Sequence, residues 1–243
     1  MKQLILSISV LVLIGVACSK QNNSNDNGNN GGSNSGALNE AGYGPSTQSF
    51  TSPNWALPAG VVLVDSIHEY SYCWAFPPYT QVPKKDWRGV PPGFSFCFTL
   101  SNPTPGVITI QFPPELVFKS TSSEHQNVLV IDLGTVIVNP GTSLTIVAQG
   151  FCLNKGRTIP QAYTGDTQEK LSYSFGPSEI PAGLKEITDI VEPKHITVLD
   201  VLKPDGSPDV DKANKYEAIQ GAIWEVTDEN GLTTNMRALL KSL

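Results

Sequence analysis

Residues 94–112 read FSFCFTLSNPTPGVITIQF, two runs of alternating character on either side of a turn. In the first run Phe94, Phe96 and Phe98 occupy every second position, and residues 108–112 repeat this alternation of apolar and polar side chains. A period of two places successive side chains on opposite faces of a β-strand. The Pro and Gly residues between the runs are turn formers. We therefore expect two half-buried strands here.

The same pattern extends outward, from about residue 61 to residue 148. Short runs rich in β-branched and aromatic residues alternate with turns rich in Pro, Gly and Ser, at a spacing that fits about six strands. The whole chain contains 21 Gly and 19 Pro, which also favours strands and turns over a helical bundle. These features predict an immunoglobulin-like antiparallel β-sandwich over residues 50–149.

Beyond residue 150 the periodicity becomes helical. Residues 184–191 have helical spacing, and a second helical run begins near residue 211. Its apolar residues form one stripe, with two further side chains one turn apart on the flank of that stripe. The stripe contains Tyr216, Ile219, Ile223 and Val226, and the flank carries Gln220 and Trp224. We therefore expect an α+β fold, in which a mixed α/β segment, residues 150–243, follows the sandwich.

Composition excludes several classes of function. The chain has 243 residues and a formal charge of −6, and only 16% of its residues are charged, so it lacks the basic stripe that nucleic acid binding requires. His68, His125 and His195 do not have the spacing of metal ligands. The sequence also lacks a nucleophile elbow and a phosphate-binding glycine loop. We expect no nucleic acid partner, no metal and no cofactor.

The N-terminal residues resemble a bacterial lipoprotein signal. Lys2 precedes an apolar run, and Gly15-Val16-Ala17-Cys18 is similar to a lipobox. The resemblance implies a signal peptide over residues 1–17, cleavage before Cys18 and a lipid on that cysteine. Residues 18–49 then form a tether rich in Asn, Ser and Gly that we expect to be disordered. The expected location is a bacterial membrane, at the outer membrane and exposed on the cell surface.

The remaining cysteines are odd in number. With Cys18 modified by lipid, an oxidising compartment leaves Cys73, Cys97 and Cys152 for pairing. Cys73 and Cys97 both lie in β-like runs flanked by aromatic residues, so a disulfide that joins two strands is plausible for them. Cys152 then remains, at a point where a strand gives way to a polar loop that could present a reactive group.

Two motifs after residue 150 resemble those of a known family. Phe151-Cys152-Leu153-Asn154 and Ile219-Gln220-Gly221-Ala222-Ile223-Trp224 look like the paired motifs of bacterial Cys-Gln thioester domains, which occur in surface adhesins. The resemblance covers about residues 150–232. It implies a thioester-type domain over residues 150–243, with the thiol on Cys152 and the carboxamide on Gln220. The preceding β region looks like the Ig-like part that accompanies such domains in some lipoproteins.

The chemistry explains these residue types. A Cys152 thiolate could attack the Gln220 carbonyl carbon and expel ammonia, provided that the two groups are held together away from bulk water. An amine on another molecule could then open the thioester and form a stable amide. Tyr216 and Trp224, one turn on either side of Gln220, would screen the bond, and Asn154 belongs to the cysteine motif. The expected partner is a protein or another amine-bearing ligand, and the reaction is single-use, so the protein is not an enzyme.

Two alternatives stay open. Cys73 also follows an aromatic residue and could supply the thiol, in which case Cys97 and Cys152 would form the disulfide. Each motif alone also has an ordinary explanation, since a buried cysteine and a glutamine beside a core tryptophan are common. The alternative function is therefore a non-covalent binding or structural β-sandwich lipoprotein without a thioester.

Overall fold

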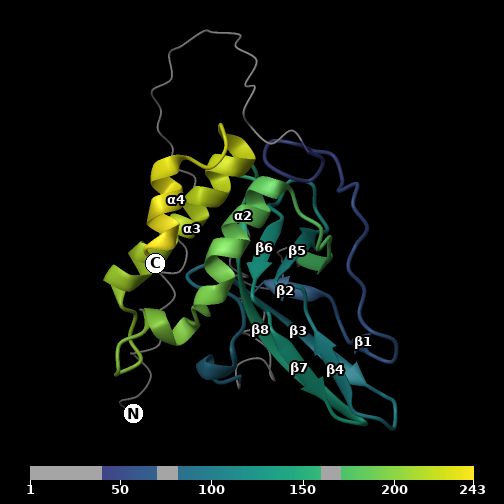
Figure 1. Cartoon of the computed structure of the whole chain (residues 1–243). Coiled ribbons are helices and arrows are strands. Elements are labelled where there is room, and N and C mark those ends of the chain that lie inside the picture. Colours follow the sequence, from purple (N-terminus) through teal and green to yellow (C-terminus); the bar gives the residue numbers. More distant parts are fainter. Residues whose placement is uncertain (1–39, 70–81, 160–170) are drawn as a thin grey trace, which may run out of the picture.

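The computed structural model describes residues 40–69, 82–159 and 171–243 (Figure 1). The expected signal peptide, Cys18 and Cys73 lie outside the described residues. Strands and helices both occur, so the expected α+β class is confirmed. Among the described residues, no helix combines the length and the apolar character needed to cross a membrane.

Seven strands form an antiparallel sheet that closes on itself. Its order is β1-β3-β2-β9-β5-β6-β8, and the additional pairing of β3 with β8 closes it into a barrel, with β1 beside β3. The remaining strands, β4 and β7, form a separate two-stranded sheet. The strand bounds are β1 Val62–Leu63, β2 Ile67–Glu69, β3 Phe94–Asn102, β4 Ile108–Gln111, β5 Glu115–Ser120, β6 Val128–Ile131, β7 Thr135–Val138, β8 Thr142–Cys152 and β9 Ser172–Phe175. These pairings do not show the immunoglobulin-like sandwich that the sequence predicts.

The predicted alternation in β3 holds, and it directs Phe96 and Phe98 into the barrel interior. Phe96 and Phe98 are fully buried in one core cluster, which also contains Phe118 of β5. The Phe98 and Phe118 rings meet edge to face, with centroids 5.9 Å apart. Cys97, between the two phenylalanines, belongs to a different cluster on the outer face of the sheet. Aromatic packing across the barrel therefore fixes the faces of β3.

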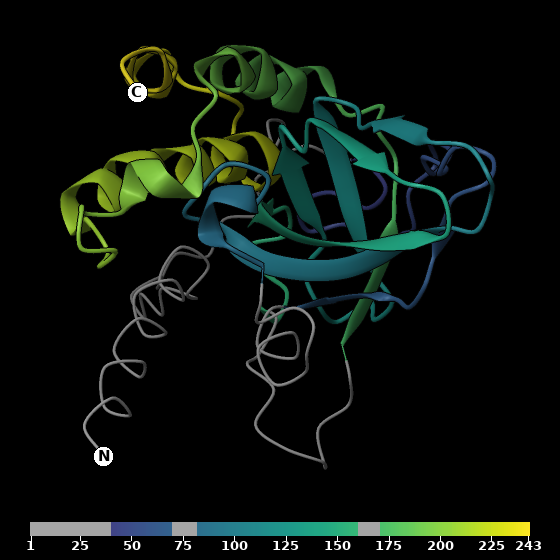
Figure 2. The same cartoon turned by 90° about the horizontal axis from the view of Figure 1, so that it is seen from below.

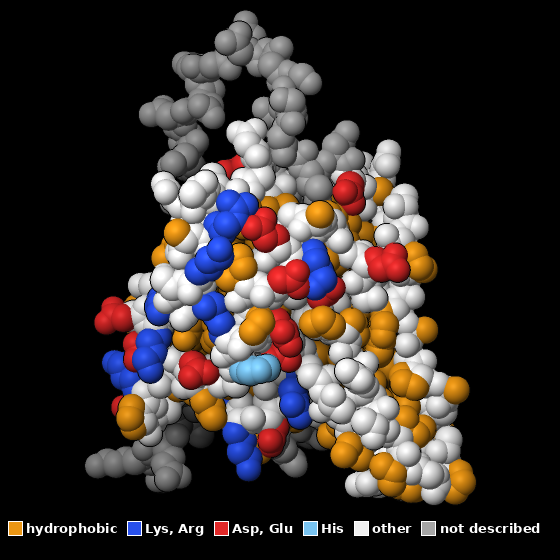
Figure 3. All heavy atoms as spheres, in the orientation of Figure 1, with side chains coloured by type: hydrophobic (Ala, Val, Ile, Leu, Met, Phe, Trp, Pro, Cys, Tyr) orange, Lys and Arg blue, Asp and Glu red, His pale blue; other side chains and the backbone are white. Residues whose placement is uncertain are grey.

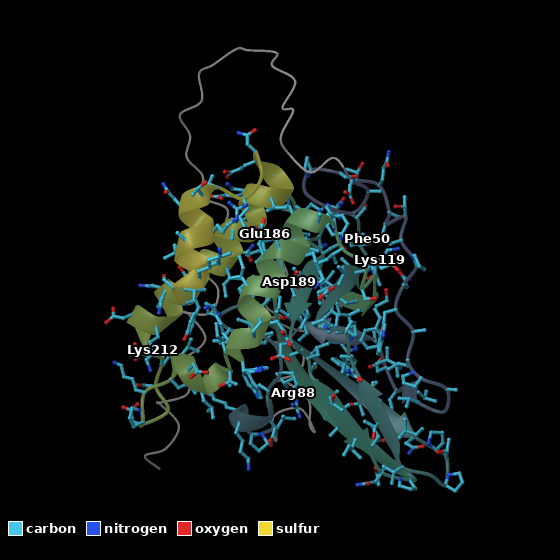
Figure 4. All side chains as sticks on the ribbon, in the orientation of Figure 1. Phe50, Arg88, Lys119, Glu186, Asp189 and Lys212 are labelled. Carbon is cyan, nitrogen blue, oxygen red and sulfur yellow. The ribbon has the colours of Figure 1, made fainter. Side chains whose placement is uncertain are left out.

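The helices cover one side of the barrel (Figures 1 and 2). They are α2 Ala182–Val191, α3 Val210–Asp228 and α4 Thr234–Lys241, with short 3-10 turns η2 Lys84–Asp86, η3 Glu192–Lys194 and η4 Val198–Val201. Their apolar residues form a second core with the outward-facing side chains of β5, β6 and β8. At the surface, Arg237 of α4 pairs with Glu186 of α2, which is labelled in Figure 4. The helical layer thus depends on the strands beneath it.

The expected boundary near residue 150 falls inside β8. Strand β9, from the second half of the chain, inserts between β2 and β5 of the same barrel. The two stretches that the sequence distinguishes therefore share one sheet. Residues 40–44, expected to belong to the tether, also pack against the body, because Tyr43 is 4% exposed within the core beneath the helices.

Truncating Phe98 to Ala should destabilise the barrel strongly, because the residue is fully buried. We expect Phe98→Ala to lower the free energy of unfolding by about 3–5 kcal/mol, measured by urea denaturation. Ile137→Ala is the control, since Ile137 is 58% exposed on β7. Its expected loss is below about 1 kcal/mol. Equal losses for the two variants would contradict this description of the core.

Candidate functional site: the end of β8 against α3

The structure brings Cys152 and Gln220 together across 68 residues of sequence. Cys152 is the last residue of β8, and Gln220 lies in the middle of α3. The Cys152 N–H donates to Gln220 Oε1 at 2.8 Å, and Gln220 Nε2 donates to the Cys152 carbonyl oxygen at 2.9 Å. Both residues are buried, with exposed fractions of 0% and 2%. The contact between the two motifs is therefore direct and shielded from water.

The strand pairing explains why this glutamine is needed. Strand β3 begins at Phe94, opposite Gly150, so β8 extends two residues beyond its partner. On its other edge β8 continues to pair with β6, and the Leu153 N–H donates to the Asn127 carbonyl oxygen at 2.9 Å. Because backbone groups of successive residues point to opposite edges, those of Cys152 point to the edge that β3 has left. The Gln220 carboxamide occupies the place of the missing strand.

The Cys152 side chain points away from α3. Phe151 and Leu153, its neighbours along β8, both pack in the core beneath the helices. Alternation along the strand places the Cβ of Cys152 on the opposite face. Its opposite residue on β6, Val128, belongs to the barrel interior. Gln220 consequently contacts the main chain of Cys152, at the position where the family resemblance implies a bond to the sulfur.

Cys97 and Cys152 are both disulfide-bonded in the structure. They are not bonded to each other, because Cys97 lies opposite Val147, five residues from Cys152. Five residues of β-strand span about 16 Å, whereas bridged cysteines have Cα atoms within about 7 Å. The alternative Cys97–Cys152 disulfide is therefore wrong. Cys73 lies outside the described residues, so the Cys73–Cys97 pairing stays a prediction.

The disulfide at Cys152 differs from the sequence expectation. The resemblance implies a Cys152 sulfur bonded to the Gln220 carbonyl carbon, whereas in the structure that sulfur is bonded to another sulfur. One sulfur cannot hold both bonds at once. Alternation along β8 also points the Cys152 side chain to the barrel side of the strand, away from the Gln220 carboxamide.

Asn154, just after β8, is hydrogen-bonded to residues 42–44. It is fully buried, and its Nδ2 donates to the carbonyl oxygens of Gly42 at 3.2 Å and Gly44 at 2.9 Å. Its Oδ1 accepts from the Asn127 N–H at 2.9 Å. The amide side chain thus joins three segments of the chain. These hydrogen bonds give Asn154 a structural role, whereas the sequence analysis predicts Asn154 as a binding residue.

The two aromatic residues predicted to flank Gln220 have different surroundings. Tyr216 packs between two hydrophobic clusters, and burial together with the Asp200 carboxylate raises the pKa of its hydroxyl. Trp224 is half-buried, and its buried Nε1 has no hydrogen-bond partner within the described chain. Lys155 Nζ lies 5.6 Å from the centroid of the Trp224 ring. The Trp224 face is therefore in contact with a cation.

Charged residues that the sequence interpretation did not select adjoin Trp224. Lys155 Nζ is 3.1 Å from Glu229 Oε1, and the Lys155 N–H donates to Asp228 Oδ2 at 3.4 Å. Burial raises the pKa of the Asp228 carboxyl group. The spacing could have pointed to Asp228, because residues 220, 224 and 228 follow one another at four-residue intervals along one helix face.

No family model, curated protein or solved structure matches this chain. Within the described ranges there is also no group of three or more His, Cys, Asp or Glu residues that could hold a metal ion. The residues at the end of β8 and on α3 therefore form the candidate site.

Removing the Gln220 carboxamide should expose the Cys152 amide to exchange. Gln220→Ala leaves a buried N–H and a buried C=O unpaired, so we expect a loss of about 2–4 kcal/mol in unfolding free energy. Hydrogen exchange should show faster exchange at Cys152, with β3 still protected. Gln111→Ala is the control, because Gln111 is exposed on β4. Unchanged protection at Cys152 in Gln220→Ala would contradict the role assigned to this side chain.

Proposed function

We propose that this chain is a lipid-anchored protein of the bacterial cell surface that forms a thioester between Cys152 and Gln220 and attaches covalently to an amine-bearing partner. The observation that carries the proposal is the buried contact between these residues, with hydrogen bonds of 2.8 and 2.9 Å. The resemblance to Cys-Gln thioester domains implies this pair, and the fold supports it by holding the Gln220 carboxamide against the main chain of Cys152 in a buried position.

The proposed reaction balances without an added reagent. In a newly made chain the Cys152 thiol adds to the Gln220 carbonyl carbon, the carbon–nitrogen bond breaks, and the thiol proton leaves with the nitrogen as ammonia. An incoming amine later attacks the same carbon, the carbon–sulfur bond breaks, and the sulfur recovers a proton. The product is an amide between Gln220 and the partner. The thioester and the disulfide are alternative products of one Cys152 thiol.

A second candidate function is a non-covalent binding module. The disulfide at Cys152 favours it, as do the two hydrogen bonds of the Gln220 carboxamide to the main chain of Cys152. Exposed hydrophobic side chains also gather over β1, β4 and β7, as Figure 3 shows. Among them Val62, Val107 and Ile137 are at least half exposed, at 50%, 61% and 58%. In this function the apolar surface, and not Gln220, would contact the partner.

Mass spectrometry of the mature chain distinguishes the two functions. A thioester lowers the mass by one ammonia, about 17 Da, and methylamine should open it to give a modified Gln220 and one new thiol. We expect the deficit to disappear in Cys152→Ala and in Gln220→Ala, and to persist in Gln111→Ala. A disulfide-linked Cys152 peptide with an unmodified Gln220, indifferent to methylamine, would contradict the thioester and favour the non-covalent module. Loss of the deficit in Cys73→Ala alone would move the thiol to Cys73.

The proposed location has a separate test. Signal-peptide cleavage and a lipid on Cys18 predict that the chain partitions with membranes, and that Cys18→Ala releases it into the soluble fraction. Protease treatment of intact cells should remove the chain if it is on the surface. Resistance to protease in intact cells, with digestion after lysis, would place it on the inner face instead. Solubility of the unaltered chain would contradict the lipid anchor.

A further inference from the structure

The ammonium group of Lys155 lies between an aromatic face and a carboxylate. Its Nζ is 5.6 Å from the centroid of the Trp224 ring and 3.1 Å from Glu229 Oε1. An aromatic face and a carboxylate together attract a cation more strongly than either does alone. The side chains of Lys155 and Glu229 are each 49% exposed, so a cation from solvent can reach this position.

A second carboxylate adds to the negative field. Asp228 accepts a hydrogen bond from Thr227 Oγ1 at 2.5 Å and one from the Lys155 N–H at 3.4 Å. These bonds hold Asp228 beside the backbone of Lys155. The ammonium group of the same lysine contacts Trp224 and Glu229. The position thus combines one aromatic ring, two carboxylates and one bound ammonium, which belongs to the chain itself.

This position is one helical turn from the Gln220 carboxamide. Trp224 follows Gln220 by four residues on α3, and side chains with that spacing have Cβ atoms about 6 Å apart. Lys155 follows Cys152 by three residues at the end of β8. A molecule that bridges the two positions therefore needs two amino groups separated by a short aliphatic chain.

We propose that Trp224, Asp228 and Glu229 form an ammonium subsite that selects diamines, or a lysine with a second ammonium nearby, as the nucleophile. This inference rests on the proposed thioester. One amine of the ligand, in its neutral form, attacks the Gln220 carbonyl carbon, an amide bond forms as the carbon–sulfur bond breaks, and one amine proton passes to the Cys152 sulfur. The other amine, as an ammonium, replaces Lys155 at the Trp224 face. Holding the second amine raises the effective concentration of the first at the reacting carbon.

The test compares diamines with monoamines of equal chain length. The mature chain is treated with putrescine or cadaverine, and in parallel with butylamine or pentylamine, at one pH and ionic strength. The rate of thioester opening is read from the mass of the Gln220 peptide. We expect the diamines to react roughly threefold to tenfold faster per amino group, as fits a single cation–aromatic contact with a carboxylate.

Variants assign the preference to the subsite. Lys155→Ala vacates it, so the ratio of diamine to monoamine rates should rise, whereas Glu229→Gln should lower that ratio. Lys212→Ala is the matched control, because Lys212 lies at the other end of α3, where it pairs with Asp209 (Figure 4). It removes the same charge and should leave the preference unchanged.

The outcomes separate this inference from the proposed function. Equal opening rates for diamines and monoamines in the unaltered chain and in Lys155→Ala would overturn the ammonium subsite and leave the thioester in place. A preference that Glu229→Gln does not reduce, or that Lys212→Ala reduces equally, would attribute it to the general charge of the protein and overturn the subsite too. Absence of opening by any amine would overturn both proposals.

Discussion

The pairing of β3 with β8 is the constraint on which the rest of the structure depends. It runs from Phe94 opposite Gly150 to Asn102 opposite Thr142 and closes the barrel. The register determines which side chains of β3 enter the interior, because a shift of one residue would turn every one of them outward. It also determines where β8 loses its partner. The unpaired edge at Cys152 is a direct consequence of that register, and Gln220 of α3 satisfies it.

The helical layer depends on the barrel in the same way. Strands β5, β6 and β8 present apolar side chains on both faces, one set to the barrel interior and the other to the helices. Because both faces of these strands are buried, α3 lies close to the end of β8. The Gln220 side chain can therefore make the hydrogen bonds that a neighbouring strand would make. Because Cys152 and Gln220 meet in a region without bulk water, their hydrogen bonds contribute more than exposed ones would.

Local features of the fold were predictable from the sequence, whereas long-range ones were not. The alternation around Phe96 and the helical stripe around Ile219 report on neighbouring residues, and both hold in the structure. Closure into a barrel depends on pairing between distant strands. The strands of a sandwich and of a barrel have the same alternating sequence pattern, so that pattern does not distinguish the two folds. The contact of Cys152 with Gln220 followed only from the family resemblance. The disulfide at Cys152 did not, since it depends on the face to which the side chain points.

Residues 42–44 determine how the body is attached to the chain that precedes it. Gly44 donates its N–H to the Leu153 carbonyl oxygen at 3.0 Å, and Asn154 holds the carbonyl oxygens of Gly42 and Gly44. A mechanical pull on the N-terminal segment is therefore delivered to the two residues that directly follow Cys152. Asn127, which also binds the Gly42 carbonyl oxygen, shares that load with the neighbouring strand. Tension along the chain would reach the Cys152–Gln220 junction at the end of β8 before it reaches the pairing of β3 with β8.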